Sequence, residues 1–322
     1  MDKNTDKDND DKTPEQPRQP KNLQGLLKFA MEATSKEDPT GPTEFHMDEE
    51  KRKFLEDALK DMTVDVKKEM LDAVKILNDP DATESDKVNA LEVINDLIDS
   101  IDNAILFQQL MGFDALIPCL NSKYESVRAA ALLLVADLVK NNQSGQLALV
   151  QLNIMSTLTN LLTHPDPICT NAMSAISSLV TNYDQGVKEL FESKEIYKIV
   201  KILETRKENR LITKVTFFLS GIPGCHPDFV DKFLDLGIMK YLSELIVPVT
   251  QEELQDSQIL NKVQNILHAT ANFCTYNRSI DDLRIIAPDL SHRLKEIVKV
   301  AATDEAFSDI QEYAEKILKV MK

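Results

Sequence analysis

The sequence has few of the residues on which β-rich and nucleotide-binding folds depend. Its 322 residues include only 8 glycines and no tryptophan, and aromatic side chains make up 6% of the total. Sheets joined by tight turns and phosphate-binding loops both use many glycines, so this composition disfavours sandwiches and glycine-rich nucleotide folds. Leucine, isoleucine, valine and alanine supply most of the apolar side chains, as is typical of packed helices.

Basic side chains are also in deficit. The chain has 37 Lys and Arg residues against 53 Asp and Glu residues, which gives a formal net charge of −16 at pH 7. A nucleic-acid-binding protein needs a basic stripe to displace counterions, and an anionic membrane would repel this chain, so we expect neither partner. The acidic total fits ordinary solubility, and it also fits a protein partner with a basic patch.

Signals for secretion and membrane insertion are missing as well. The first residues, MDKNTDKDNDDK, are too charged for a signal peptide, and no apolar run approaches the roughly 18 residues that span a bilayer. The four cysteines lie far apart without a CxxC pair, which indicates reduced thiols in or near helices; they are Cys119, Cys169, Cys225 and Cys274. The expected location is the cytosol, with the nucleus as a second location, and we expect a monomer.

Catalytic and metal-binding motifs are absent from the sequence. It contains no GxxxxGK[ST], GxGxxG, GxSxG or HExxH motif, and its cysteines and histidines match no zinc spacing. Cys225 and His226 are adjacent, and we interpret them as a half-buried thiol beside a surface histidine at a helix turn. We therefore expect no cofactor, no metal and no enzymatic activity.

The most informative pattern is a hydrophobic triad with i, i+4, i+7 spacing, which recurs every 41 or 42 residues. The four copies are Phe113/Ile117/Leu120, Ile154/Leu158/Leu161, Ile196/Val200/Leu203 and Ile238/Leu242/Leu245. Each triad marks one face of a helix, and a helical unit that recurs at this period predicts an α-solenoid. The fold class is therefore all-α.

Two further helices in each unit favour armadillo repeats over two-helix HEAT repeats. Long third helices align as Ala90/Ile94/Leu97, Ala131/Val135/Leu138, Ala172/Ile176/Leu179, Val215/Leu219/Ile222 and Val263/Leu267/Thr270. Short first helices are expected near 103–111, 144–152, 185–193 and 227–236. Three helices in about 42 residues predict a right-handed armadillo solenoid with helical caps.

Composition divides the chain into six segments. Residues 1–21 are polar and are expected to be disordered, 22–34 form a short amphipathic helix, 35–47 a flexible linker, 48–80 an N-terminal helical cap, 81–250 four armadillo-like repeats, and 251–322 a C-terminal repeat and cap. The last repeat includes a longer loop at VTQEELQDSQ. The cap's final helix should bury Phe307, Ile310, Tyr313 and Ile317.

The third helices of an armadillo solenoid line its concave side, and their register predicts which side chains face the groove. One column is Asp96, Asp137, Ser178 and Gly221, and the other, one turn earlier, is Glu92, Leu133, Ser174 and Phe217. Peptide carriers of the nuclear-import type repeat a Trp and an Asn at such positions, and this chain does not. A small, acidic lining suits a folded partner, although the same positions would also serve as a solvated helix surface.

Four sequence segments, in this order along the chain, together form a motif pattern. They are NLQGLLKFAMEAT, HMDEEKRKFLEDAL, the run from Leu97 to Asp102-Asn103-Ala104, and an RAAA…NN…Q run at Arg128–Ala131, Asn141, Asn142 and Gln146. Together they resemble the armadillo nucleotide exchange factors of the seventy-kilodalton heat-shock chaperone, the heat-shock-protein-binding protein and yeast Fes type. The resemblance covers about residues 22–250.

The resemblance implies a co-chaperone that grips the nucleotide-binding domain of that chaperone with its concave face and promotes ADP release. It also implies that the N-terminal helix assists client release, through Leu23, Leu26, Leu27 and Met31. The implied partner-binding residues, together with two groove positions, are Asp102, Asn103, Ala104, Arg128, Asp137, Asn141, Asn142, Lys214 and Phe217. At Ala104 a small side chain would let the partner approach, and Lys214 would be a basic contact.

Several alternatives remain open from the sequence. Arg128 could instead form a structural ion pair with Glu125 or near Asp137. Asn141 and Asn142 could simply form the turn at the C-terminus of a helix. The segment LSGIPGCHPD, with two glycines and a proline, predicts a bend at 219–227. A generic armadillo adaptor for another folded protein is the alternative function.

Overall fold

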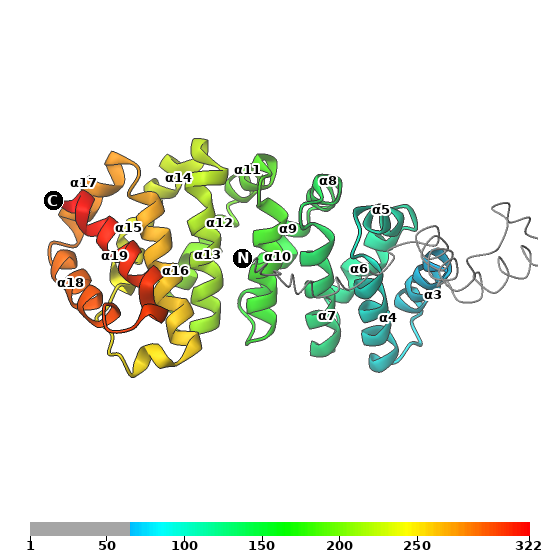
Figure 1. Cartoon of the computed structure of the whole chain (residues 1–322). Helices are drawn as coiled ribbons and strands as arrows, with labels where there is room; N and C mark the ends of the chain where they lie inside the picture. The colour runs from blue at the N-terminus through cyan, green and yellow to red at the C-terminus, as the bar shows by residue number, and fades with distance from the viewer. Residues whose placement is uncertain (1–64) are drawn as a thin grey trace, which may run out of the picture. The chain divides into compact units, whose positions relative to one another are not determined.

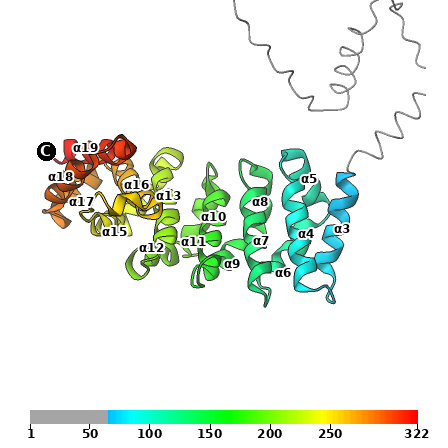
Figure 2. The same cartoon turned by 60° about the horizontal axis from the view of Figure 1, so that its bottom comes forward.

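The computed structural model describes residues 65–322, and within this range the chain forms helices and no strand. The third helices of successive repeats pack against one another in one continuous layer. They are α4 (Glu84–Leu97), α7 (Glu125–Leu138), α10 (Ile168–Val180), α13 (Asn209–Cys225) and α16 (Ser257–Phe273). Figures 1 and 2 show the repeats following one another in chain order, from α3 to α19.

The second helices cover one side of this layer, each packed on the third helix of its own repeat. They are α6 (Gly112–Leu120), α9 (Ile154–Leu161), α12 (Ile196–Thr205) and α15 (Ile238–Leu245). All residues of the four predicted triads are buried except Ile117 and Leu245, which are half-buried. The recurring triad therefore predicted the core correctly, and the all-α armadillo fold is confirmed.

The first helices bridge from each third helix to the next second helix. They are α5 (Ile101–Gln109), α8 (Gln143–Gln151), α11 (Asp184–Glu192) and α14 (Val230–Asp235), the last preceded by the 3-10 turn η1 (Pro227–Phe229). Each begins within three residues of its predicted start.

No single helix between residues 65 and 322 is long and apolar enough to cross a membrane. Helices α5 and α6 together would have the necessary length and apolar composition, but they are bent by 88° relative to each other.

A residue in the left-handed conformation turns the chain between the first and second helices of every repeat. These residues are Met111, Asn153, Lys194 and Gly237, with φ values of 59°, 55°, 63° and 75°. Glycine adopts this conformation without a steric penalty, whereas the other three side chains hold it at some cost. The corner is therefore dictated by the packing of the repeat rather than by a glycine signal in the sequence.

The two ends of the described solenoid are closed by further helices. At the N-terminal end, α3 (Val66–Asn78) packs on α4. At the C-terminal end, α17 (Asn277–Ile286), α18 (Leu290–Ala301), the 3-10 turn η3 (Glu305–Phe307) and α19 (Ser308–Met321) follow α16. The insertion VTQEELQDSQ is a loop with the short turn η2 (Glu253–Gln255), which is anchored by buried Leu254.

Two local expectations need correction. The two glycines and Pro223 do not interrupt the helix: α13 continues through them to Cys225, and the chain leaves the helix only at His226, before the 3-10 turn η1. In the last helix, Ala314 is buried where Tyr313 was expected, and Tyr313 instead stacks on His268 with ring centroids 4.7 Å apart. The aromatic ring therefore joins α19 to α16 at the edge of the core.

Candidate partner-binding face

The exposed side of the third-helix layer, opposite the second helices, is the surface that the two predicted columns form; we call it the third-helix face. In the first column Asp96 and Asp137 are exposed, whereas Ser178 and Gly221 are half-buried. The second column consists of exposed Glu92, Leu133 and Phe217, with half-buried Ser174 between the last two. The register predicted from sequence thus brings these residues to one face.

Two large apolar side chains on this face lack cover from the described chain. Leu133 of α7 is 49% exposed and Phe217 of α13 is 59% exposed. The intervening helix α10 contributes only small polar side chains to this side, Ser174 and Ser178. Helices pack 8–10 Å apart, so the axes of α7 and α13, which carry the two apolar side chains, are roughly 20 Å apart. Aromatic side chains are enriched at protein interfaces, so Phe217 is the stronger candidate anchor of the two.

Lys214 is exposed on α13, one turn before Phe217. Arg210 lies a further turn back along the same helix, and its Nη1 is 3.0 Å from Asp166 Oδ2. No described residue forms an ion pair with Lys214, so its ammonium is available for a contact with a partner. Arg210 was missed by the sequence reasoning, although its i, i+4 spacing from Lys214 could have identified it.

A hollow of about 500 Å³ opens at the edge of the face, where α4 turns into α5 and α7 turns into α8; we call it the rim hollow. Its lining is Asn95, Ile98, Asp99, Ser100, Ile101, Ala104, Asp137, Leu138, Lys140, Asn141 and Asn142. Four of the predicted site residues therefore come together here: Ala104, Asp137, Asn141 and Asn142. The hollow combines an apolar floor with charged groups around its mouth.

The three residues of the Asp-Asn-Ala run have different environments. Asp102 is exposed on the first turn of α5. Asn103 is half-buried, and its Nδ2 donates a hydrogen bond of 2.6 Å to the carbonyl of Leu97, which ties the start of α5 to the end of α4. Ala104 is only 5% exposed, so a larger side chain there would meet both the core and the rim hollow. Asn103 therefore holds the corner of the hollow in place.

The two adjacent asparagines form a helix-terminal turn, as the structural alternative proposed. Asn141 adopts the left-handed conformation after α7, with φ of 55°. Asn142 is buried and caps α8: its side chain accepts a hydrogen bond from the Gly145 N–H and donates one to the Leu138 carbonyl. Asn142 thus satisfies backbone groups at both helix ends, and only Asn141 is exposed to a partner.

Arg128 forms no ion pair with Glu125 or any other described carboxylate. Its Nη1 donates a hydrogen bond of 2.6 Å to the carbonyl of Ser122, just after α6. Arg293 makes the same kind of contact at the C-terminal end of α15, with the carbonyls of Ser243 in its last turn and of Ile246 just after it. Arginines therefore bind carbonyls at the C-terminal ends of two second helices, which gives Arg128 a structural role.

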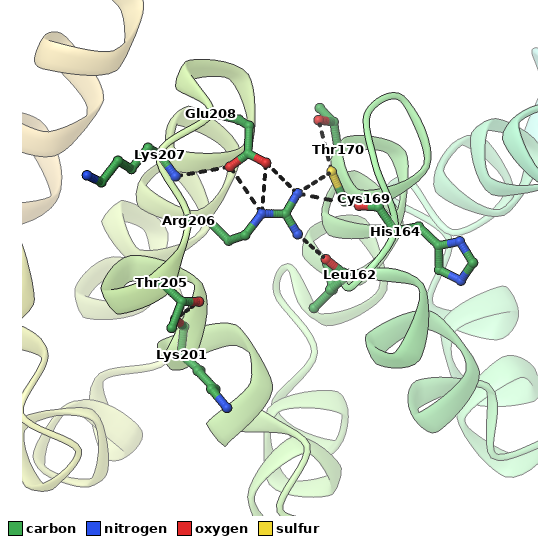
Figure 3. A network of polar contacts seen from close by, with 9 residues as sticks. All are labelled: Leu162, His164, Cys169, Thr170, Lys201, Thr205, Arg206, Lys207 and Glu208. Atoms are coloured by element: carbon green, nitrogen blue, oxygen red, sulfur yellow. Dashed lines mark hydrogen bonds and ion pairs between the residues drawn. The ribbon is translucent and has the colours of Figure 1, made fainter.

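A third arginine, Arg206, binds the carbonyls that follow α9, as Figure 3 shows. Its guanidinium donates to the carbonyls of Leu162 and His164, and it also reaches the sulfur of Cys169. Glu208 pairs with it through both carboxylate oxygens, 2.9 and 3.0 Å from Nε. This hydrogen bonding lowers the pKa of Glu208 to about 2. The network fixes the start of α13, and hence Lys214 and Phe217, against the preceding repeat.

The burial of Cys225 and His226 is the reverse of what the sequence suggested: the histidine is buried and the cysteine is exposed. His226 is 2% exposed, and its Nδ1 lies 2.5 Å from Asp184 Oδ1 of the preceding repeat, whereas Cys225 is exposed. The other three cysteines are buried, and burial raises the pKa of Cys274 to about 12. Among residues 65–322 no three His, Cys, Asp or Glu side chains are grouped so that they could hold a metal ion.

The predicted client-release residues Leu23, Leu26, Leu27 and Met31 lie outside the described residues, as do the segments 1–21, 22–34 and 35–47.

Comparisons with known proteins agree with the motif resemblance. Residues 23–105 match the family described as "Nucleotide exchange factor Fes1". The chain is 27% identical over 246 residues to Hsp70-binding protein 1 of Macaca fascicularis, which covers 71% of this chain and 67% of that protein. It is 26% identical over 202 residues to the Hsp70 nucleotide exchange factor FES1 of Yarrowia lipolytica, covering 60% and 72% respectively.

Solved structures support the fold alone. A designed armadillo repeat protein superimposes with a TM-score of 0.62 at 18% sequence identity, over 79% of this chain and 100% of the designed one. The match of residues 23–105 confirms the resemblance to Fes1-type exchange factors that the ordered motifs indicated. The solved structures confirm the armadillo architecture.

Proposed function

We propose that this chain is a nucleotide exchange factor, a co-chaperone that accelerates ADP release from an Hsp70-type chaperone without catalysing a reaction itself. The match of residues 23–105 to the Fes1 exchange factors, together with relatives named as Hsp70-binding proteins and exchange factors, supports this function. We further propose that the third-helix face binds the chaperone's nucleotide-binding domain, which is the finer part of the proposal.

The mechanism is a shift of population. A rigid face that binds the open form of the nucleotide-binding domain better than the closed form stabilises the open form. Because the coupling between two ligands is reciprocal, ADP must then bind more weakly by the same factor, typically 5- to 150-fold. The exposed side chains Leu133 and Phe217 supply contact area, and Lys214 supplies a charge that selects the orientation.

Phe217 provides the sharpest test of where the partner binds. We expect Phe217→Ala to weaken binding of the isolated nucleotide-binding domain by tenfold or more, about 1.5–2 kcal/mol, because an exposed aromatic anchor would lose its buried contact. Tyr197 on α12 is a matched control, since it is 58% exposed but lies on a second helix. Calorimetric titration should show nearly unchanged affinity for Tyr197→Ala. Equal affinities for wild type and Phe217→Ala would place the interface elsewhere.

We also propose that the N-terminal segment assists client release, through Leu23, Leu26, Leu27 and Met31. The variant Leu26→Asp with Leu27→Asp should then slow the dissociation of a fluorescent client peptide from the chaperone, because two apolar contacts are lost. ADP release should stay at the wild-type rate, since the third-helix face is intact. Normal client release by this variant would remove the segment from the mechanism.

A further inference from the structure

The charges of the third helices change sign along the solenoid. Helix α4 has four carboxylates and one lysine, and α7 has two carboxylates and one arginine. Helix α10 has no charged side chain, α13 has only Arg210 and Lys214, and α16 has only Lys262. With histidine neutral, the net charges from α4 to α16 are therefore −3, −1, 0, +2 and +1.

This progression runs against the acidity of the whole chain, whose net charge is −16. A 17-residue helix without any carboxylate, α13, lies three positions along the layer from the most acidic one, α4. The acidic side chains that reach the face are Glu92, Asp96 and Asp137, all of them exposed. The acidic part of the small, acidic lining expected from the sequence therefore lies on α4 and α7.

Nearby groups weaken this polarity. Asp166 pairs with Arg210, which leaves Lys214 as the exposed cation of α13 that no described residue pairs with. Lys262 of α16 hydrogen-bonds to Asn209 Oδ1 at the start of α13, and its charge is partly offset by the nearby carboxylate of Glu253. At the acidic end, Lys140 and Asp99 both line the rim hollow. His268 of α16 adds little charge at neutral pH, because burial lowers its pKa.

The two ends are far enough apart to act separately. From α4 to α13 there are three helix-to-helix steps of 8–10 Å, roughly 27 Å in all. Charges on a protein surface are screened over about 8–10 Å in physiological salt, so each end interacts with a different part of a partner. A lobe that spans the face would meet exposed carboxylates at α4 and α7 and the exposed ammonium of Lys214 at α13.

We infer that the third-helix face binds its partner in one fixed orientation, with a basic surface of the partner against α4 and α7 and an acidic surface against α13. This inference rests on the proposed function and specifies the partner's surface chemistry. Complementary charges at separated positions set the direction of docking, because the reversed orientation places like charges opposite each other at both ends. Leu133 and Phe217, one near each end, are then buried together.

Charge reversals distinguish this arrangement from a uniformly acidic face. The acidic end is tested by Asp96→Lys with Asp137→Lys, and the basic end by Lys214→Glu. A fixed orientation predicts that both variants associate with the isolated nucleotide-binding domain more slowly, by roughly five- to tenfold at low salt. In about 0.5 M salt, where screening is strong, most of the difference should disappear. A uniformly acidic face predicts faster association for Lys214→Glu.

Matched controls separate the site from the total charge. Lys201→Glu on α12 and Asp114→Lys on α6 change exposed residues of second helices, and we expect both to associate at rates within about twofold of wild type. Unchanged or faster association of Lys214→Glu would overturn the inference while leaving the proposed function intact. Failure of the wild-type chain to bind the domain or to release ADP would overturn the proposed function, and the inference with it.

A cross-linking measurement reads the orientation directly. A photoreactive side chain at position 137 should attach to lysine- or arginine-rich peptides of the partner domain, and one at position 214 to peptides rich in aspartate or glutamate. Mass spectrometry of the two products identifies these peptides. Both positions attaching to the same peptides, or to peptides of the opposite charge, would contradict a fixed orientation.

Discussion

Single residues at the repeat corners hold conformations that their side chains disfavour. Met111, Asn153 and Lys194 occupy the left-handed region at the turn between first and second helices, where the fourth repeat has Gly237. For side chains such as those of Met111 and Lys194 this conformation costs about 1–2 kcal/mol, whereas asparagine tolerates it better. The second helices must nevertheless start at these points to bury their triads, so the packing of the repeat maintains the turn.

Lys194 tests this explanation. Lys194→Gly removes the steric penalty but makes the unfolded chain more flexible, so we expect a net gain of about 0.5–1 kcal/mol in the free energy of unfolding. Lys188→Gly, in the middle of helix α11, should instead lose about 1 kcal/mol. Urea titrations of both variants provide the measurement. Equal losses for the two would show that the corner carries no strain.

The sequence predicted the corner less well than the helices, for a physical reason. Hydrophobic periodicity marks which side chains face the core, and it located the triads and the third-helix columns. Met111 and Lys194 carry no local signal for a left-handed turn, because tertiary packing imposes it. Similarly, the role of Asn142 depends on Leu138 and Gly145, whose positions only the folded corner defines.

Among the secondary-structure elements, the second helices are joined to their neighbours by arginines that bind exposed carbonyls. Arg206 connects the segment before α13 with the end of α9, and Glu208 orients its guanidinium. These contacts align α13, the helix that carries Phe217.

The rim hollow lies between two successive helix corners, so its shape could not be predicted from the sequence. Four of its lining residues were nevertheless predicted as partner contacts.

The pairing of Glu208 with Arg206 makes this junction sensitive to acid. The pKa of Glu208 falls from its ordinary 4.5 to about 2 in the folded state. A depressed pKa contributes stability that is present above pH 4.5 and is lost as the pH falls toward 2. We therefore expect wild type and Glu208→Gln to differ in the free energy of unfolding at pH 7. The difference should be less than about 1 kcal/mol, because the carboxylate is half exposed.

The same two proteins should converge as the pH is lowered to about 2. Arg206→Met is the contrasting variant, and it should lose about 1–3 kcal/mol at both pH values, because the carbonyl contacts that it removes do not titrate. Denaturant titrations at the two pH values measure the differences. A Glu208→Gln difference that stays constant with pH would show that the ion pair adds no pH-dependent stability.

At the level of the whole molecule, the described part of the chain is a row of repeats that presents one extended, asymmetric face. Its third helices bring Leu133, Phe217 and Lys214 to that face, and its charge changes sign from α4 to α13. The sequence contained the periodicity, the motifs and the charges themselves. The change of sign along the third helices could be recognised only once the helix bounds showed which charged residues each third helix contains.

The most direct test of the proposed function is the rate at which labelled ADP leaves the nucleotide-binding domain of an Hsp70-type chaperone. With increasing amounts of this chain, stopped-flow fluorescence should show a release rate that rises to a plateau well above the spontaneous rate. Phe217→Ala should need a higher concentration to reach it. A release rate that stays at the spontaneous value at saturating concentrations of the wild-type chain would contradict the proposal.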